Sequence, residues 1–172
     1  MKKVISAIMM LTVLAGLQAC TSSAIDTVKG GTLTLDSSLS VGQAFENYSY
    51  FKITSWDSYE DNRGRQIVEF KGVMDYGKFV GANYGGSILS PEIVTKAKKN
   101  MENMEMSVLA QFAVKGNRFL LIFSGINVGR VDENGKLHQK KIPDTRMETI
   151  EAVYRNEPLE LVSIMLLNFC SK

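Results

Sequence analysis

The sequence contains little of what metal centres and common catalytic sites require. It has one histidine, His138, and two cysteines, Cys20 and Cys170, among 172 residues. No serine lies in a nucleophile elbow, and no pair of carboxylates has a sequence context that would shift a pKa. We therefore predict that the protein is not an enzyme. Carboxylates that assemble only in the folded chain leave an unrecognised hydrolase as an alternative.

A hydrophobic run long enough to span a membrane is also missing. The longest candidate, residues 4–19, covers 16 residues, whereas a spanning helix needs roughly 20. Lys2 and Lys3 precede this run, and small residues lie near its end. A positive start, a short apolar run and a small-residue end are typical of an export signal.

The four residues Leu17-Gln18-Ala19-Cys20 resemble the lipobox of bacterial lipoproteins. The resemblance implies that the Cys20 thiol receives a diacylglycerol, that cleavage occurs before Cys20, and that the new amino group is acylated. The alternative is ordinary secretory cleavage after Ala19, for which Leu17 is large. Each buried methylene contributes about 0.8 kcal/mol, so two or three acyl chains anchor a protein durably.

The lipobox defines the expected domain organisation and location. We predict a cleaved signal over residues 1–19, a lipidated Cys20 with a short tether over 20–31, and a single α+β domain over 32–172. Small polar residues at 21–24 and the pair Gly30-Gly31 favour the tether. The residue after the cysteine is Thr21 rather than an aspartate. This resembles the enterobacterial sorting pattern of lipoproteins that are sent to the outer membrane, and it implies that location, with the domain facing the periplasm.

Neither basic nor acidic residues are in excess once the predicted signal is removed. Two of the 20 basic residues, Lys2 and Lys3, belong to the signal, which leaves 18 basic against 18 acidic residues in a chain of 153. One domain of this size buries enough surface to fold. The balance gives no basis for binding nucleic acid or anionic lipid through a broad positive face.

Hydrophobic alternation and turn signals predict an α+β fold. Ser40 with Gln43 forms a capping box, and Ser90-Pro91 opens a second helix. A bulge near Ser55 would reconcile the changing parity of apolar residues in one strand. We expect an antiparallel sheet of four to six strands with helices packed on at least one face, strand 119–123 being covered on both faces. The predicted strands are 32–35, 50–59, 67–70, 107–115, 119–123 and 137–142; the predicted helices are 41–47, 91–104, 145–155 and 159–169.

The run from Ser40 to Met74, a capped helix followed by a hairpin that contains Trp56, is similar to part of a known group. It resembles the helix-plus-hairpin units of small periplasmic lipoproteins of the SmpA and β-lactamase-inhibitor-like type. The resemblance covers about 35 residues. It implies a sheet with helices on one face and a binding role.

Two segments are candidates for partner contacts. Residues 75–86 contain four glycines among Tyr76, Phe79 and Tyr84, which predicts a mobile loop whose aromatic side chains are either merely exposed or form a contact surface. The last predicted helix has only three polar residues, so it is either buried on nearly all sides or covers an apolar patch meant for contact. Ile164 and Leu167 are its candidate contact residues, for an envelope protein or a second copy of the chain.

Met101, Met104 and Met106 have the spacing Met-x-x-Met-x-Met. This spacing is similar to the methionine motifs of periplasmic copper-handling proteins, and thioethers select Cu(I). The alternative is that they fill the core, because methionine packs well in irregular spaces. We predict packing, no metal and no cofactor other than the lipid on Cys20.

Together these observations predict a membrane-anchored periplasmic lipoprotein that acts as a non-catalytic binding or assembly-accessory module of the bacterial envelope. The alternatives are a periplasmic Cu(I) binder and an unrecognised hydrolase. After lipidation Cys170 is the only thiol, and we expect it to end the last helix as a small apolar residue.

Overall fold

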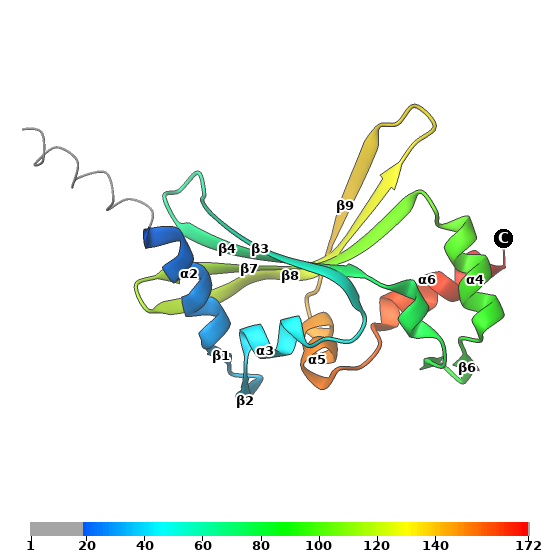
Figure 1. Ribbon diagram of the computed structural model, residues 1–172, viewed down its shortest axis with the longest axis horizontal. Helices are drawn as coiled ribbons and strands as arrows, with labels where there is room; N and C mark the ends of the chain where they lie inside the picture. The colour runs from blue at the N-terminus through cyan, green and yellow to red at the C-terminus, as the bar shows by residue number, and fades with distance from the viewer. Residues whose placement is uncertain (1–18, 172) are drawn as a thin grey trace, which may run out of the picture.

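The computed structural model describes residues 19–171 (Figure 1). Of the predicted export signal, residues 1–19, all but the last residue lie outside the described part of the chain. The side chain of Cys20 lies outside it as well. Among the described residues, no helix is both long and apolar enough to cross a membrane.

The fold is α+β and is built on a five-stranded antiparallel sheet, as the sequence predicts. The strand order is β3-β4-β7-β8-β9, and two small hairpins, β1-β2 and β5-β6, lie outside this sheet. The strands are β1 (Thr32–Leu33), β2 (Asp36–Ser40), β3 (Phe51–Glu60), β4 (Gln66–Met74), β5 (Asn83–Tyr84), β6 (Ser87–Ile88), β7 (Met104–Lys115), β8 (Arg118–Val131) and β9 (Leu137–Pro143). The helices are α2 (Ala19–Gly30), α3 (Val41–Glu46), η2 (Tyr76–Phe79), α4 (Pro91–Asn100), α5 (Glu148–Arg155) and α6 (Glu160–Cys170).

Helices α2, α3 and α5 lie under one face of the sheet (Figure 1). Between them and the strands is a cluster that we call the aromatic core. Its closest ring pair is Phe45 with Phe70, whose centroids are 4.7 Å apart at 86°. Edge-to-face ring pairs add to the free energy gained by burial. The aromatic core consists of Phe45, Trp56, Phe70, Phe112 and Tyr154.

The opposite face of the sheet is open, which corrects the prediction that residues 119–123 are covered on both sides. Leu121 faces the core, but Leu120 is 68% exposed and Ile122 is 38% exposed. The reason is that the helices α2, α3 and α5 cover only one face, and β8 lies next to the edge strand β9. An apolar run alone does not distinguish a doubly covered strand from one with aliphatic side chains on an open face.

The stretch predicted as a tether, residues 20–31, is instead almost entirely the helix α2. Val28 is fully buried and Ala24 is 6% exposed, and the helix contacts α3 and strands of the sheet. At its end, the backbone N–H of Val41 donates to the carbonyl oxygen of Gly31 at 2.8 Å. The helix is therefore part of the domain, because two small apolar residues spaced four apart place one helical stripe against the core.

Both predicted caps are present. The Ser40 hydroxyl accepts from the backbone N–H of Gln43 at 3.2 Å, and the Gln43 side chain accepts from the N–H of Ser40 at 3.0 Å. Ser90 caps α4 in the same way through the N–H of Ile93. However, α4 ends at Asn100 rather than near residue 104, because the following residues from Met104 onward pair with β8.

The bulge in β3 is real but lies nearer the start of the strand than Ser55. The register with β4 shifts between Phe51 and Ile53. The Phe51 ring lies over Gly72, where any Cβ atom would overlap it. The shift therefore lets an aromatic side chain cover a glycine on the neighbouring strand, and it leaves Ile53 60% exposed.

Candidate binding groove

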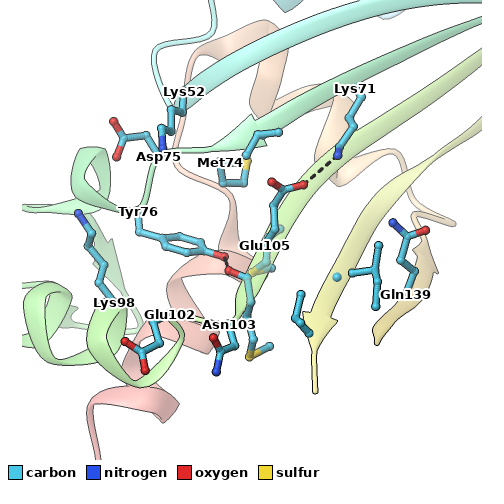
Figure 2. A pocket seen from close by; sticks show the side chains of 16 residues that line it. Lys52, Lys71, Met74, Asp75, Tyr76, Lys98, Glu102, Asn103, Glu105 and Gln139 are labelled. Atoms are coloured by element: carbon cyan, nitrogen blue, oxygen red, sulfur yellow. Dashed lines mark hydrogen bonds and ion pairs between the residues drawn. The ribbon is translucent and has the colours of Figure 1, made fainter. Parts of the chain in front are cut away.

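A groove of about 760 Å³ lies where several strand ends meet. There β4 ends, β7 begins, β8 ends and β9 begins, and the start of η2 and the end of α4 complete the walls (Figure 2). We call it the charged groove. Its polar and charged residues are Lys52, Lys71, Asp75, Tyr76, Lys98, Glu102, Asn103, Glu105 and Gln139.

The turn between β4 and η2 places one wall of the groove. The Asp75 carboxylate accepts a hydrogen bond from the backbone N–H of Gly77 at 2.9 Å, which caps η2. The same turn is fixed by the backbone N–H of Asp75, which donates to the carbonyl oxygen of Tyr50 at 2.8 Å. Short polar side chains favour such caps because they satisfy the first amides of a helical turn. Tyr76 is thereby aimed across the groove toward β7 (Figure 2).

The groove has an equal number of lysines and carboxylates among its lining residues. The ammonium of Lys71 lies 2.8 Å from a carboxylate oxygen of Glu105, and their side chains are 37% and 53% exposed (Figure 2). An ion pair this exposed contributes roughly 0–1 kcal/mol to stability. Its side chains are therefore available to other partners at little cost to the fold. The remaining charged residues are Lys52, Lys98, Asp75 and Glu102.

Tyr76 is the aromatic residue of the groove. Its hydroxyl lies 3.5 Å from the carbonyl oxygen of Met104, and burial raises the pKa of Tyr76 to about 12. The phenol is therefore neutral at physiological pH and is a hydrogen-bond donor. This residue is one of the predicted contact candidates, and the structure places it in the groove.

The other predicted contact candidates are not brought to this groove. Phe79 is fully buried and packs on Tyr50 with ring centroids 4.8 Å apart, so the prediction that it forms part of a contact surface is wrong. Residues 75–86 are not one open loop: η2 turns the Phe79 side chain inward, and the β5-β6 hairpin follows. Tyr84 is half-buried on β5.

Helix α6 lies beside α4, and its two candidate residues are half-buried. Leu167 packs against the main core, while Ile164 lines a smaller cleft with Ile126 and Ile142. The face that contains Val162 and Leu166 is fully buried. The helix is therefore not buried on all sides, and it does not present a fully exposed apolar face either. It ends at Cys170, whose half-buried thiol donates to the carbonyl oxygen of Leu167 at 2.9 Å.

The three methionines of the Met-x-x-Met-x-Met spacing do not belong to one element, because Met101 is at the C-cap of α4 while Met104 and Met106 belong to β7. Met101 and Met106 are buried, and Met104 is partly buried against the same core. Met104 and Met106 border the charged groove together with Met74. Among residues 19–171 there is no group of three or more histidine, cysteine, aspartate and glutamate side chains that could hold a metal ion.

Most of the groove could not be predicted from the sequence. Its lysines and carboxylates come from β3, β4, α4, β7 and the turns that precede η2 and follow α4, and each looks like an ordinary solvated residue in its own segment. Alternation along β7 puts Glu105 on the same strand face as Gln111, but Glu105 precedes the predicted strand 107–115. The strand register that brings Lys71 near Glu105 is not encoded in a local pattern. The one sequence signal for the groove was that Lys71 and Glu105 lie close to two predicted strands that could be neighbours.

Comparison with known proteins yields no relative for this chain: no family model, no curated protein and no solved structure matches it. The chemistry of the groove therefore has to be inferred from its own residues. It combines cations, carboxylates, a phenol donor and thioether edges in an open depression, a mixture suited to binding a surface that is itself of mixed charge.

Proposed function

We propose that this protein is a lipid-anchored, periplasm-facing lipoprotein of the bacterial outer membrane and a non-catalytic binding or assembly-accessory module of the envelope. The observation that carries the proposal is the cysteine of Leu17-Gln18-Ala19-Cys20, which resembles a lipobox. Cys20 lies in the first turn of α2, and the following turns of that helix are buried against the domain. An acyl chain on Cys20 would thus hold the domain close to the membrane.

The charged groove is the proposed binding surface, and an envelope protein is its proposed partner. Charges of both signs around an open depression favour a protein surface of complementary charge over a small ligand, which would need a more enclosed and more apolar pocket. The adjacent β8-β9 hairpin rises from the sheet (Figure 1) and exposes Val131 and Leu137, by 42% and 55%. Both residues also line the groove, so they add apolar contact area at its rim.

Co-purification from detergent extracts, with matched charge reversals on α4, tests this assignment. Lys98 lines the groove, whereas Lys96 lies on the same helix outside it, and both are exposed. We expect Lys98→Glu to lose the partner that the unchanged protein retains, and Lys96→Glu to keep it. Equal recovery of one partner by both variants would contradict binding through the charged groove.

A Cu(I)-binding role is the second candidate, because the thioether residues Met74, Met104 and Met106 border one groove. Soft thioether ligands select Cu(I) over harder cations. Anaerobic titration tests it with Met104→Leu, which keeps the volume but removes the sulfur. One tightly bound Cu(I) per chain that this variant loses while staying folded would favour copper over protein binding. We expect no such stoichiometric site.

A further inference from the structure

One end of the molecule contains both the start of α2 and two hairpin turns of the sheet. In Figure 1 the β3-β4 turn and the β7-β8 turn lie at the same end as the first residues of α2, and the C-terminal end of α6 lies at the opposite end. Helix α2 contacts β3, β4, β7 and β8, so this arrangement is fixed by packing. Residue 20 therefore has a set position relative to the two turns.

The β7-β8 turn is basic. Lys115 and Arg118 flank the two-residue turn Gly116-Asn117, and both are exposed. Between this turn and the β3-β4 turn lies a shallow groove of about 640 Å³, lined by these two cations, by Arg65 and by Leu120. Leu120 is 68% exposed. Cations beside an exposed aliphatic side chain are the combination that interfacial membrane contacts use.

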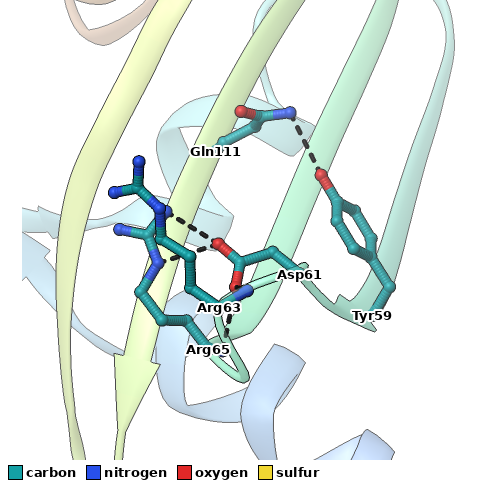
Figure 3. Close-up of polar contacts among 5 residues, drawn as sticks. All are labelled: Tyr59, Asp61, Arg63, Arg65 and Gln111. Carbon is teal, nitrogen blue, oxygen red and sulfur yellow. Dashed lines mark hydrogen bonds and ion pairs between the residues drawn. The ribbon is translucent and has the colours of Figure 1, made fainter.

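The β3-β4 turn adds a further cation, because its aspartate is occupied within the turn (Figure 3). One carboxylate oxygen of Asp61 accepts from the backbone N–H groups of Arg63 and Arg65, each at 2.9 Å. The other oxygen accepts from the Arg65 guanidinium at 2.7–2.8 Å. Asp61 therefore offsets Arg65, while Arg63 is exposed beside it.

We call Arg63, Lys115, Arg118 and Leu120 the tip surface. Glu60 is the exposed acid of the same turn region, so the three cations exceed it locally although the mature chain as a whole is electrically balanced. A balanced total charge thus conceals an uneven distribution, which the composition could not reveal. A local cluster acts within about a Debye length, near 8 Å at physiological ionic strength.

We propose that the tip surface rests on the anionic phospholipid headgroups of the membrane that holds Cys20. The inference depends on the proposed function, because only lipid on Cys20 brings a membrane to this end of the molecule. Because α2 packs on the domain through Ala24 and Val28, the contact fixes the orientation of the protein. The α4-α6 end, with the charged groove beside it, then points away from the membrane toward the periplasm.

Fluorescence quenching by a headgroup spin label tests this with the full chain, purified from membranes and reconstituted in vesicles. A dye is placed at Asn117→Cys in the β7-β8 turn or at Asn134→Cys in the β8-β9 turn, each in a Cys170→Ser background. We expect strong quenching at residue 117 in vesicles with anionic phospholipid, weak quenching in phosphatidylcholine vesicles, and none at residue 134. Each basic side chain at an anionic surface shifts the binding equilibrium roughly fivefold, so Lys115→Ser with Arg118→Ser should lower the ratio of membrane-facing to released orientations by about 25-fold.

The matched control is Lys136→Ser with Lys140→Ser, which removes two exposed cations from the β9 region and should leave the quenching at residue 117 unchanged. Quenching at residue 134 as strong as at 117, equal quenching in neutral vesicles, or an equal loss in the control would overturn the inference. The intact mass of the same preparation separates the two proposals. Lipidated protein with an unquenched tip contradicts this inference alone, whereas protein without lipid contradicts the proposed function and this inference together.

Discussion

The aromatic core and the charged groove lie in one domain but are built from opposite kinds of contact. In the aromatic core, Phe45, Phe70 and Phe112 are fully buried and their rings meet edge to face. In the charged groove, the Lys71–Glu105 pair has both side chains more than a third exposed. The difference implies that stability comes mainly from the core, and that the charged residues of the groove can be changed with little loss of stability. Substitutions in the two regions should separate these effects.

The largest expected loss of stability comes from Phe45→Ala. This residue contacts four other rings and has no exposed surface, so its truncation should lower the free energy of unfolding by about 3–5 kcal/mol. Urea unfolding of a chain that spans residues 20–172 measures it, with Phe45→Leu as a milder variant if the first does not fold. A loss below about 1 kcal/mol would show that the aromatic core is not the main source of stability.

Met106→Ala and Met104→Ala compare a buried wall of the groove with a partly exposed one. Met106 is fully buried, and its truncation should cost about 2–5 kcal/mol. Met104 lies two residues earlier on the same strand and is only partly buried, so it should cost clearly less. The same unfolding measurement ranks them. A larger loss of stability in Met104→Ala than in Met106→Ala would mean that Met104, rather than Met106, packs into the core at this wall of the groove.

Ionisation of buried tyrosines should destabilise both regions at high pH. Burial raises the pKa of Tyr154 in the aromatic core and of Tyr76 in the groove to about 12, above the ordinary tyrosine value of about 10. A raised pKa means that stability is fully present below pH 10 and is lost as pH rises through about 12. Urea midpoints measured across this range should fall less in Tyr154→Phe and in Tyr76→Phe. A midpoint that stays constant in the unchanged protein would contradict the burial of these phenols.

The smallest expected effect on stability is that of breaking the Lys71–Glu105 pair. Glu105→Gln removes the charge but keeps the shape, and an exposed pair contributes roughly 0–1 kcal/mol. The same variant is expected to weaken partner binding, because the groove then presents one carboxylate fewer. A large loss of stability with unchanged partner recovery would mean that the pair stabilises the fold and does not take part in binding, which would contradict this expectation.

Much of the fold could be predicted from the sequence because its signals are local. The capping box at Ser40 and the Ser90-Pro91 helix start each depend on a few neighbouring residues. Asp144 accepts from the backbone N–H groups of Glu148 and Thr149, the first two residues of α5, at 3.1 and 2.7 Å. The helix itself begins at Glu148 rather than at the predicted residue 145, with Met147 at its N-cap position. These contacts decide conformation before tertiary packing does.

The errors arose where tertiary contacts decide the outcome. Helix α2 has weak local signals, and its small polar residues resemble a tether, but Ala24 and Val28 gain their stability from burial. The exposure of Leu120 depends on which face the helices cover, which an apolar run does not specify. The charged groove depends on strand register across β4 and β7. Of the candidate contact residues, only Tyr76 lies in it.

We propose above that lipid on Cys20 holds this domain at a membrane, and the intact mass of the protein purified from membranes is the most direct test. We expect a chain that begins at Cys20, heavier than residues 20–172 by the mass of a diacylglyceryl group and an acyl chain, and a Cys20→Ser variant that stays uncut and without lipid. A chain that starts at Cys20 with an unmodified thiol, or a Cys20→Ser variant that is processed and lipid-labelled normally, would contradict it.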